Sequence, residues 1–136
     1  MSTRATYQFV DKHSDFTVFK HHDGYPEGGL QWIARALKYA WPLPRFEADE
    51  FAASFVAANK PRGGGGDIRL TTSKDVHGDT EYHYVVTRVD GKIHVQVNDL
   101  ILGSGNKDRK LNLISEGFLD DLLDKYAPGR EWIKEV

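Results

Sequence analysis

Residues 80–98 read TEYHYVVTRVDGKIHVQVN, in which apolar and polar side chains alternate on both sides of Asp90-Gly91. Two alternating runs that flank an Asp-Gly pair are typical of a β-hairpin closed by a type I′ turn. A two-residue turn also sets the register of the two strands. The pairs that it predicts are Val89 with Lys92, Val86 with Val95, and Tyr84 with Val97.

The two faces of this hairpin differ in character. His83 and His94 belong to one face, and the register separates them by about four residue positions, or roughly 13 Å along the strands. The two imidazoles therefore cannot bind one metal ion together. The other face is apolar and should lie on the core, and its members are Tyr82, Tyr84, Val86, Ile93, Val95 and Val97.

The chain before the hairpin predicts two paired strands, two helices and a third strand. Residues 4–10 and 16–21 should form a hairpin, because apolar side chains alternate on both sides of a polar turn. From Pro26 the apolar period becomes that of a helix, which should run to Trp41, and a second helix should begin near Glu47. Residues 67–72 follow as a strand. The buried stripe of the first helix would be Leu30, Ile33, Ala34, Leu37 and Trp41.

The glycine run Gly63–Gly66 lies within residues 60–66, which we expect to form a flexible loop. The loop would lead from a helix into a strand, which is the reverse of the order in phosphate-binding loops. After the central hairpin, residues 100–112 predict a polar loop, and a third helix should begin with Ser115 as its cap.

These elements predict an α+β fold for residues 1–136 as a single domain. The expected order is β-β-α-α-β-β-β-α, with an antiparallel sheet covered by helices. The chain carries 18 Lys and Arg against 20 Asp and Glu, and the net charge of −2 argues against nucleic-acid binding. No apolar run approaches the roughly 20 residues of a membrane span. The absence of cysteine and of a secretory signal predicts a cytoplasmic protein.

Residues 20–28, Lys-His-His-Asp-Gly-Tyr-Pro-Glu-Gly, concentrate polar chemistry where a strand becomes a helix. Pro26 suits the first helical position, and Asp23 or Gly24 can cap the helix. The two histidines and the tyrosine exceed what such a turn requires. Arg4, on the adjacent strand, should form an ion pair with Asp23 or Glu27. The binding candidates are therefore Arg4, His21, His22, Asp23, Tyr25 and Glu27.

Three interpretations of this turn remain open. It can be an ordinary polar corner, or a contact for a partner or an anionic ligand, because the first N–H groups of a helix attract anions. It can also hold a metal, although His21 and Asp23 supply only two ligands and His13 or His77 would have to supply a third. The pattern itself identifies no cofactor.

Ser2 provides a catalytic alternative. Removal of Met1 would leave Ser2 with a hydroxyl and a free α-amine, the nucleophile and base of N-terminal-nucleophile hydrolases. Ser2-Thr3-Arg4 resembles the Cys-Thr-Arg that opens some amidases of this class, and the expected order of elements is similar to their layered α-β-β-α arrangement. The short chain and the serine nucleophile depart from the class, so we favour a non-enzymatic role.

Two motifs resemble a group of small uncharacterised proteins from bacteria and their phages. In that group an initial Ser-Thr-Arg and a His-Trp-Asp-Gly-Tyr-Pro motif recur. This chain matches with residues 2–4 and 21–26, and it has His22 where tryptophan is usual. Residues 44–51, Pro-Arg-Phe-Glu-Ala-Asp-Glu-Phe, look similar as well. The resemblance implies a host- or defence-interacting role that is anti-CRISPR-like.

Three functions follow as hypotheses. The first is a small binding protein, plausibly encoded by a phage or another mobile element, that acts on a protein partner. The second is a hydrolase that uses Ser2. The third is a small-ligand or metal binder at the turn formed by residues 21–27.

Overall fold

The central hairpin is formed by β4 (Tyr82–Val89) and β5 (Lys92–Ile101) in the computed structural model, which describes residues 2–101 and 110–133. The three predicted pairs are confirmed. Asp90 and Gly91 have φ angles of 51° and 75°, as a type I′ turn requires. The apolar face is buried except for Tyr82, which is partly exposed, and His83 and His94 lie on the opposite face as predicted.

The described residues form a six-stranded sheet with the order β3-β2-β1-β4-β5-β6. The remaining strands are β1 (Ala5–Val10), β2 (Asp15–Lys20), β3 (Ile68–Thr71) and β6 (Lys110–Phe118). The α+β prediction is confirmed, but the sheet is mixed, because β1 and β4 are parallel. The backbone N–H of Glu81 donates to Arg4 O at 2.9 Å, so β4 starts beside the start of β1.

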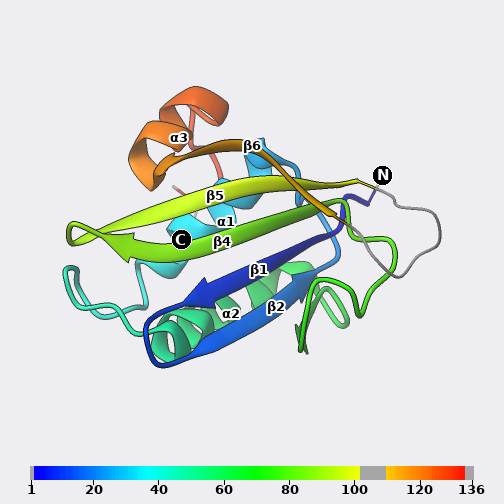
Figure 1. Cartoon of the computed structure of the whole chain (residues 1–136), viewed down its shortest axis with the longest axis horizontal. Coiled ribbons are helices and arrows are strands. Elements are labelled where there is room, and N and C mark those ends of the chain that lie inside the picture. Colours follow the sequence, from blue (N-terminus) through cyan, green and yellow to red (C-terminus); the bar gives the residue numbers. More distant parts are fainter. Residues whose placement is uncertain (1, 102–109, 134–136) are drawn as a thin grey trace.

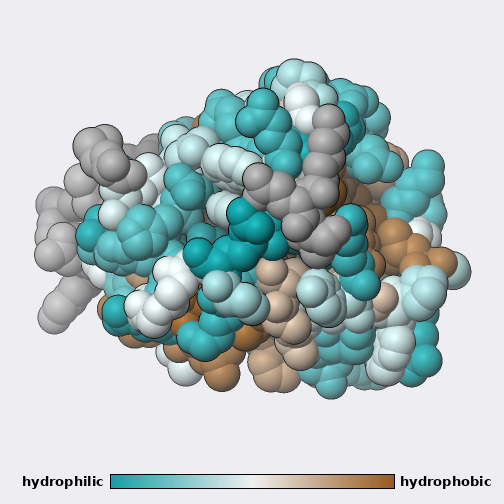
Figure 2. Space-filling model, turned by 180° about the vertical axis from the view of Figure 1, so that it is seen from behind, coloured by the Kyte–Doolittle hydropathy of each residue, from teal (hydrophilic) through white to brown (hydrophobic). Residues whose placement is uncertain are grey.

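The described residues include three helices that cover one face of this sheet, which Figure 1 shows from the opposite side. They are α1 (Pro26–Ala36), α2 (Ala48–Gly63) and α3 (Leu119–Tyr126). The core lies between the two layers, where Tyr7 and Phe9 of β1 contact Phe55 of α2 at ring-centroid distances of 4.6 and 5.3 Å. Seen from the helical side, the surface is mostly hydrophilic, with separate apolar patches (Figure 2).

The first helix ends earlier than predicted. Because α1 stops at Ala36, Leu37 and Trp41 leave the buried stripe and are 36% and 38% exposed. The prediction that these two side chains are buried is therefore wrong. Trp41 also precedes a proline, a position that disfavours helical backbone.

The second helix extends further than predicted. It includes residues 60–63, so the loop assigned to residues 60–66 begins only at Gly64. Pro61 lies inside the last turn of α2, where the loss of one backbone donor affects only the end of the helix.

The predictions of a loop over residues 100–112 and of a helix that begins with Ser115 as its cap are also wrong. Residues 110–118 form β6, and α3 begins at Leu119 instead of following a Ser115 cap. Residues 102–109 of that loop lie outside the described residues. β6 is an edge strand with one neighbour in the sheet, and its Leu111 and Leu113 are exposed. Such a strand does not need a strongly apolar face, so its sequence does not stand out as a strand. No helix in the described ranges is long and apolar enough to cross a membrane.

Candidate functional site

A buried ion pair lies beneath residues 21–27, which we call the histidine turn. Lys20, the last residue of β2, extends toward the helices, and its Nζ donates to Asp67 Oδ2 at 2.9 Å. The two side chains are only 4% and 1% exposed. Lys20 Nζ also donates to His22 O at 3.1 Å and lies 4.4 Å from the ring centroid of Trp32. Removing two charges from water costs several kcal/mol, which only close pairing and hydrogen bonding can offset.

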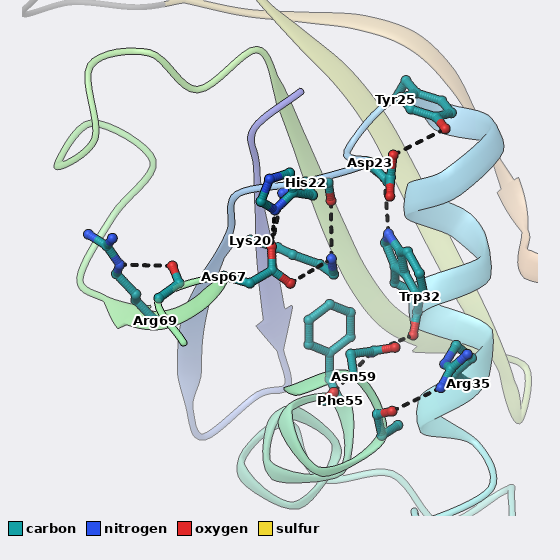
Figure 3. Close-up of polar contacts among 12 residues, drawn as sticks. Lys20, His22, Asp23, Tyr25, Trp32, Arg35, Phe55, Asn59, Asp67 and Arg69 are labelled. Atoms are coloured by element: carbon teal, nitrogen blue, oxygen red, sulfur yellow. Dashed lines mark hydrogen bonds and ion pairs between the residues drawn. The ribbon is translucent and has the colours of Figure 1, made fainter. Parts of the chain in front are cut away.

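Asp67 is the centre of this network, as Figure 3 shows. Its Oδ1 accepts hydrogen bonds from the backbone N–H of His22 at 3.1 Å and from His22 Nδ1 at 2.9 Å. Burial raises the pKa of Asp67, but the hydrogen bonds from Lys20 and His22 outweigh it and hold the pKa below its ordinary value. Asp67 is therefore a carboxylate at neutral pH.

His22 presents one nitrogen of its ring to this carboxylate and leaves the other available. A carboxylate only accepts hydrogen bonds, so Nδ1 must carry the proton that is shared with Asp67. In the neutral imidazole, Nε2 is then an acceptor. The His22 side chain is 51% exposed, so the ring can be reached from outside. Asp67 thus orients His22 and selects its tautomer.

The glycine run positions Asp67 against the end of α2. A methyl group at Gly63 would overlap the Asp67 carboxylate, so only glycine leaves room for it. Gly64 and Gly66 have φ angles of 74° and 82°, which side chains rarely adopt. The interpretation of residues 60–66 as a flexible linker therefore needs correction, because these glycines shape the turn that carries Asp67.

A cavity of about 380 Å³ opens beside His22, between β2, α1 and the end of α2. Asn59, in the last turns of α2, lies on its wall and is 1% exposed. Its Nδ2 donates to Trp32 O and Phe55 O, both at 3.0 Å. Within the described ranges, Asn59 Oδ1 accepts no hydrogen bond although it is buried. The wall also includes His22, Asp23, Arg62, Asp67 and Trp132.

The glycines of the histidine turn have structural roles. An added methyl group at Gly24 would meet Ala5 Cβ at 2.5 Å, and one at Gly29, in the first turn of α1, would overlap Cζ and Oη of Tyr84. Tyr84 Oη donates to Gly24 O at 2.5 Å, which fixes the turn to β4. The prediction that Asp23 or Gly24 caps α1 is wrong. Tyr25 is the N-cap residue, and no described side chain makes a capping hydrogen bond there.

Four of the predicted binding residues line two neighbouring cavities. His22 and Asp23 line the cavity, whereas Tyr25 and Glu27 border a second hollow of about 200 Å³. Trp132 borders both hollows, and Tyr25 Oη donates to Asp23 Oδ1 at 3.3 Å.

His21 lies beside the cavity rather than in it. Its ring packs on His22 at a centroid distance of 4.6 Å, and burial together with the nearby Arg4 and His22 charges lowers its pKa. The predicted ion pair of Arg4 with Asp23 or Glu27 is wrong. Arg4 Nε instead pairs with Asp79 at 2.8 Å, because the loop before β4 passes over the start of β1.

The hydrolase and metal alternatives gain no support from this geometry. Ser2 is partly exposed and does not line the cavity. The described residues form one sheet, so the α-β-β-α layers of the hydrolase interpretation are not present among them. In residues 2–101 and 110–133, no three His, Asp or Glu side chains are grouped to hold a metal ion.

Three residues of the site were missed in the sequence, and two of them left a signal. Lys20 shares a face with Val18 in the alternation of β2, so a buried cation could have been predicted. Asp67 follows the glycine run directly. Asn59 gave no signal, because its burial depends on how α2 packs against α1.

Compared with known proteins, the chain matches no family model, no curated protein and no solved structure.

Proposed function

We propose that this is a cytoplasmic protein that binds a small molecule in the cavity beside His22. The observation that carries the proposal is the pairing of an oriented, accessible imidazole with an unpaired buried acceptor, Asn59 Oδ1, on one cavity wall. The volume of about 380 Å³ falls in the range of ligand pockets and suits a compact molecule.

The energetic cost of this arrangement supports a role in binding. An apolar pair in place of Lys20 and Asp67 would avoid the desolvation of two charges. The ion pair does something that an apolar pair would not, because Asp67 holds His22 in one orientation and tautomer. A buried acceptor without a partner costs about 1–3 kcal/mol, which a donor on a ligand would recover.

Fragment titration by NMR tests this function. A ¹⁵N-labelled sample is titrated with a panel of cationic, neutral and anionic fragments, and at least one should shift the amide signals of residues 22, 23, 59 and 67 together. His22→Ala should abolish these shifts, whereas His13→Ala, in the remote turn between β1 and β2, should leave them unchanged. Both variants should keep the dispersed spectrum of the folded protein. Shifts that map elsewhere, or that survive His22→Ala, would contradict the proposal.

A protein partner is a second candidate function, favoured by the connection between α1 and α2. Tyr39, Trp41 and Leu43 are exposed there, and the Arg45 guanidinium stacks over Trp41 at 3.4 Å from the ring centroid. Arg88 Nη1 donates to Pro44 O at 2.6 Å and ties this connection to β4. Figure 1 shows it at the same end of the molecule as the turn between β4 and β5. Tyr, Trp and Arg are the residue types enriched at binding hot spots.

Paired capture experiments test this second candidate. The wild-type chain should retain a protein that Tyr39→Ala with Trp41→Ala loses, and the two purified proteins should then form a complex. Leu70→Ala removes an apolar side chain on β3 that is 81% exposed, more than Tyr39 or Trp41, and should not affect capture. Equal capture by the wild type and the double variant would exclude this surface.

A further inference from the structure

The cavity wall carries two cations, Lys20 and Arg62, and two carboxylates, Asp23 and Asp67. Lys20 and Asp67 neutralise each other through their ion pair. Arg62 also lies on the wall, but it is already engaged in an interaction of its own. Asp23 is different, because its carboxylate receives one hydrogen bond, from Tyr25 Oη at 3.3 Å. Among the described residues, no Lys, Arg or His forms an ion pair with Asp23.

The polar atoms of the wall that lack a full set of hydrogen bonds within the described residues are acceptors. Asn59 Oδ1 is buried and has no partner in the described chain. His22 Nε2 is an acceptor in the tautomer that Asp67 selects. The Asp23 carboxylate accepts from Tyr25 Oη alone among the described side chains. The wall therefore holds three acceptors that can take a further hydrogen bond. The nearby ring of Trp132 adds an aromatic surface of the kind that attracts cations.

We infer that the ligand is a small organic cation with several N–H donors, such as an ammonium or amidinium compound. This inference rests on the proposed ligand-binding function. The cation would place its charge against Asp23 and donate to Asn59 Oδ1 and His22 Nε2. It replaces the anionic ligand expected from the helix N-terminus, because Asp23, an acidic residue, lies on the cavity wall at that end of α1.

Three isosteric probes separate charge from shape. Benzamidine is a cation, benzamide is neutral and benzoate is an anion, and each is titrated by NMR and calorimetry at neutral pH. Benzamidine should bind in the cavity about tenfold more tightly than benzamide, because hydrogen bonds to charged groups are stronger than neutral ones. Benzoate should bind most weakly of the three.

Asp23→Asn tests the assigned carboxylate. Asparagine tolerates the φ of 58° at this position and can still accept from Tyr25, so the turn should keep its conformation. The variant should lose about tenfold in benzamidine affinity and little in benzamide affinity. Asp121→Asn, which removes an exposed carboxylate on α3, should change neither affinity.

The outcomes separate this inference from the function on which it rests. Tighter binding of benzamide or benzoate in the cavity would overturn the cation and leave the ligand site standing. The same holds if Asp23→Asn binds benzamidine as tightly as the wild type does. If no fragment of any charge shifts the signals of the cavity residues, the inference and the proposed function both fail.

Discussion

His83 should make the stability of the fold depend on pH between 5 and 7. It lies on the sheet face opposite the helices, yet it is 2% exposed. Its Nε2 is 2.9 Å from Gln8 Oε1, which only accepts, so Nε2 carries the ring proton. Its Nδ1, 2.7 Å from Thr6 Oγ1, then accepts from the threonine hydroxyl. This neutral imidazole is fully hydrogen-bonded, and a second ring proton would remove its acceptor.

Burial, aided by the positive charge of Lys74, lowers the pKa of His83 from 6.5 to about 4, against weaker opposing effects of Asp15 and Asp75. The unfolded chain therefore binds more protons than the folded one between these two values. The stabilisation is fully present above pH 6.5 and is lost as the pH falls toward 4. The difference of 2.5 pH units corresponds to about 3 kcal/mol, of which about 2 kcal/mol is lost between pH 7 and pH 5.

Urea unfolding at pH 7 and pH 5 measures this loss. His83→Gln keeps an N–H donor for Gln8 but cannot be protonated, so its free energy of unfolding should fall about 2 kcal/mol less than that of the wild type. His94→Gln, on the same face of the sheet but partly exposed, should behave like the wild type. If His83→Gln and the wild type lose equal stability, the buried neutral imidazole is not the cause and the reasoning is refuted.

Three further predictions concern the core and the site. Leu30 is fully buried, so Leu30→Ala should lower the free energy of unfolding by about 2–5 kcal/mol in urea, whereas Leu37→Ala should cost less than about 1 kcal/mol. Lys20→Met should cost about 3–5 kcal/mol, because it leaves the Asp67 carboxylate buried without its cation; an unchanged midpoint would show that Asp67 reaches water. Gly29→Ala should lower the melting temperature because its methyl group would overlap the Tyr84 ring, and Gly78→Ala, which meets no atom within 4 Å, is the control.

The sequence predicts an element well where pattern and turn chemistry agree. Asp90-Gly91 fixed the register of β4 and β5 because only a few residue pairs adopt two positive φ angles readily. It predicts poorly where an element is half exposed. Leu111 and Leu113 alternate on β6, but both are exposed, and a strand with so little buried surface needs few apolar residues. Its sequence therefore predicts a loop up to residue 112 and a helix cap at Ser115 instead of a strand. The apolar periodicity of α1 continues in the sequence past the end of the helix at Ala36. It therefore predicts that Leu37 is buried, whereas this side chain is exposed.

The candidate site shows a different limit, which arises from pairing at long range. Lys20 shares a face with Val18, and this alone implies a buried cation that needs an anionic partner. The chain has 20 Asp and Glu residues, and the identity of the partner depends on where α2 ends and how tightly the glycine turn returns to β3. Only the folded arrangement brings Asp67 to Lys20 and His22, 47 and 45 residues away in the chain. The histidine turn could thus be identified from its composition, whereas the carboxylate that orients His22 could be identified only from the structure.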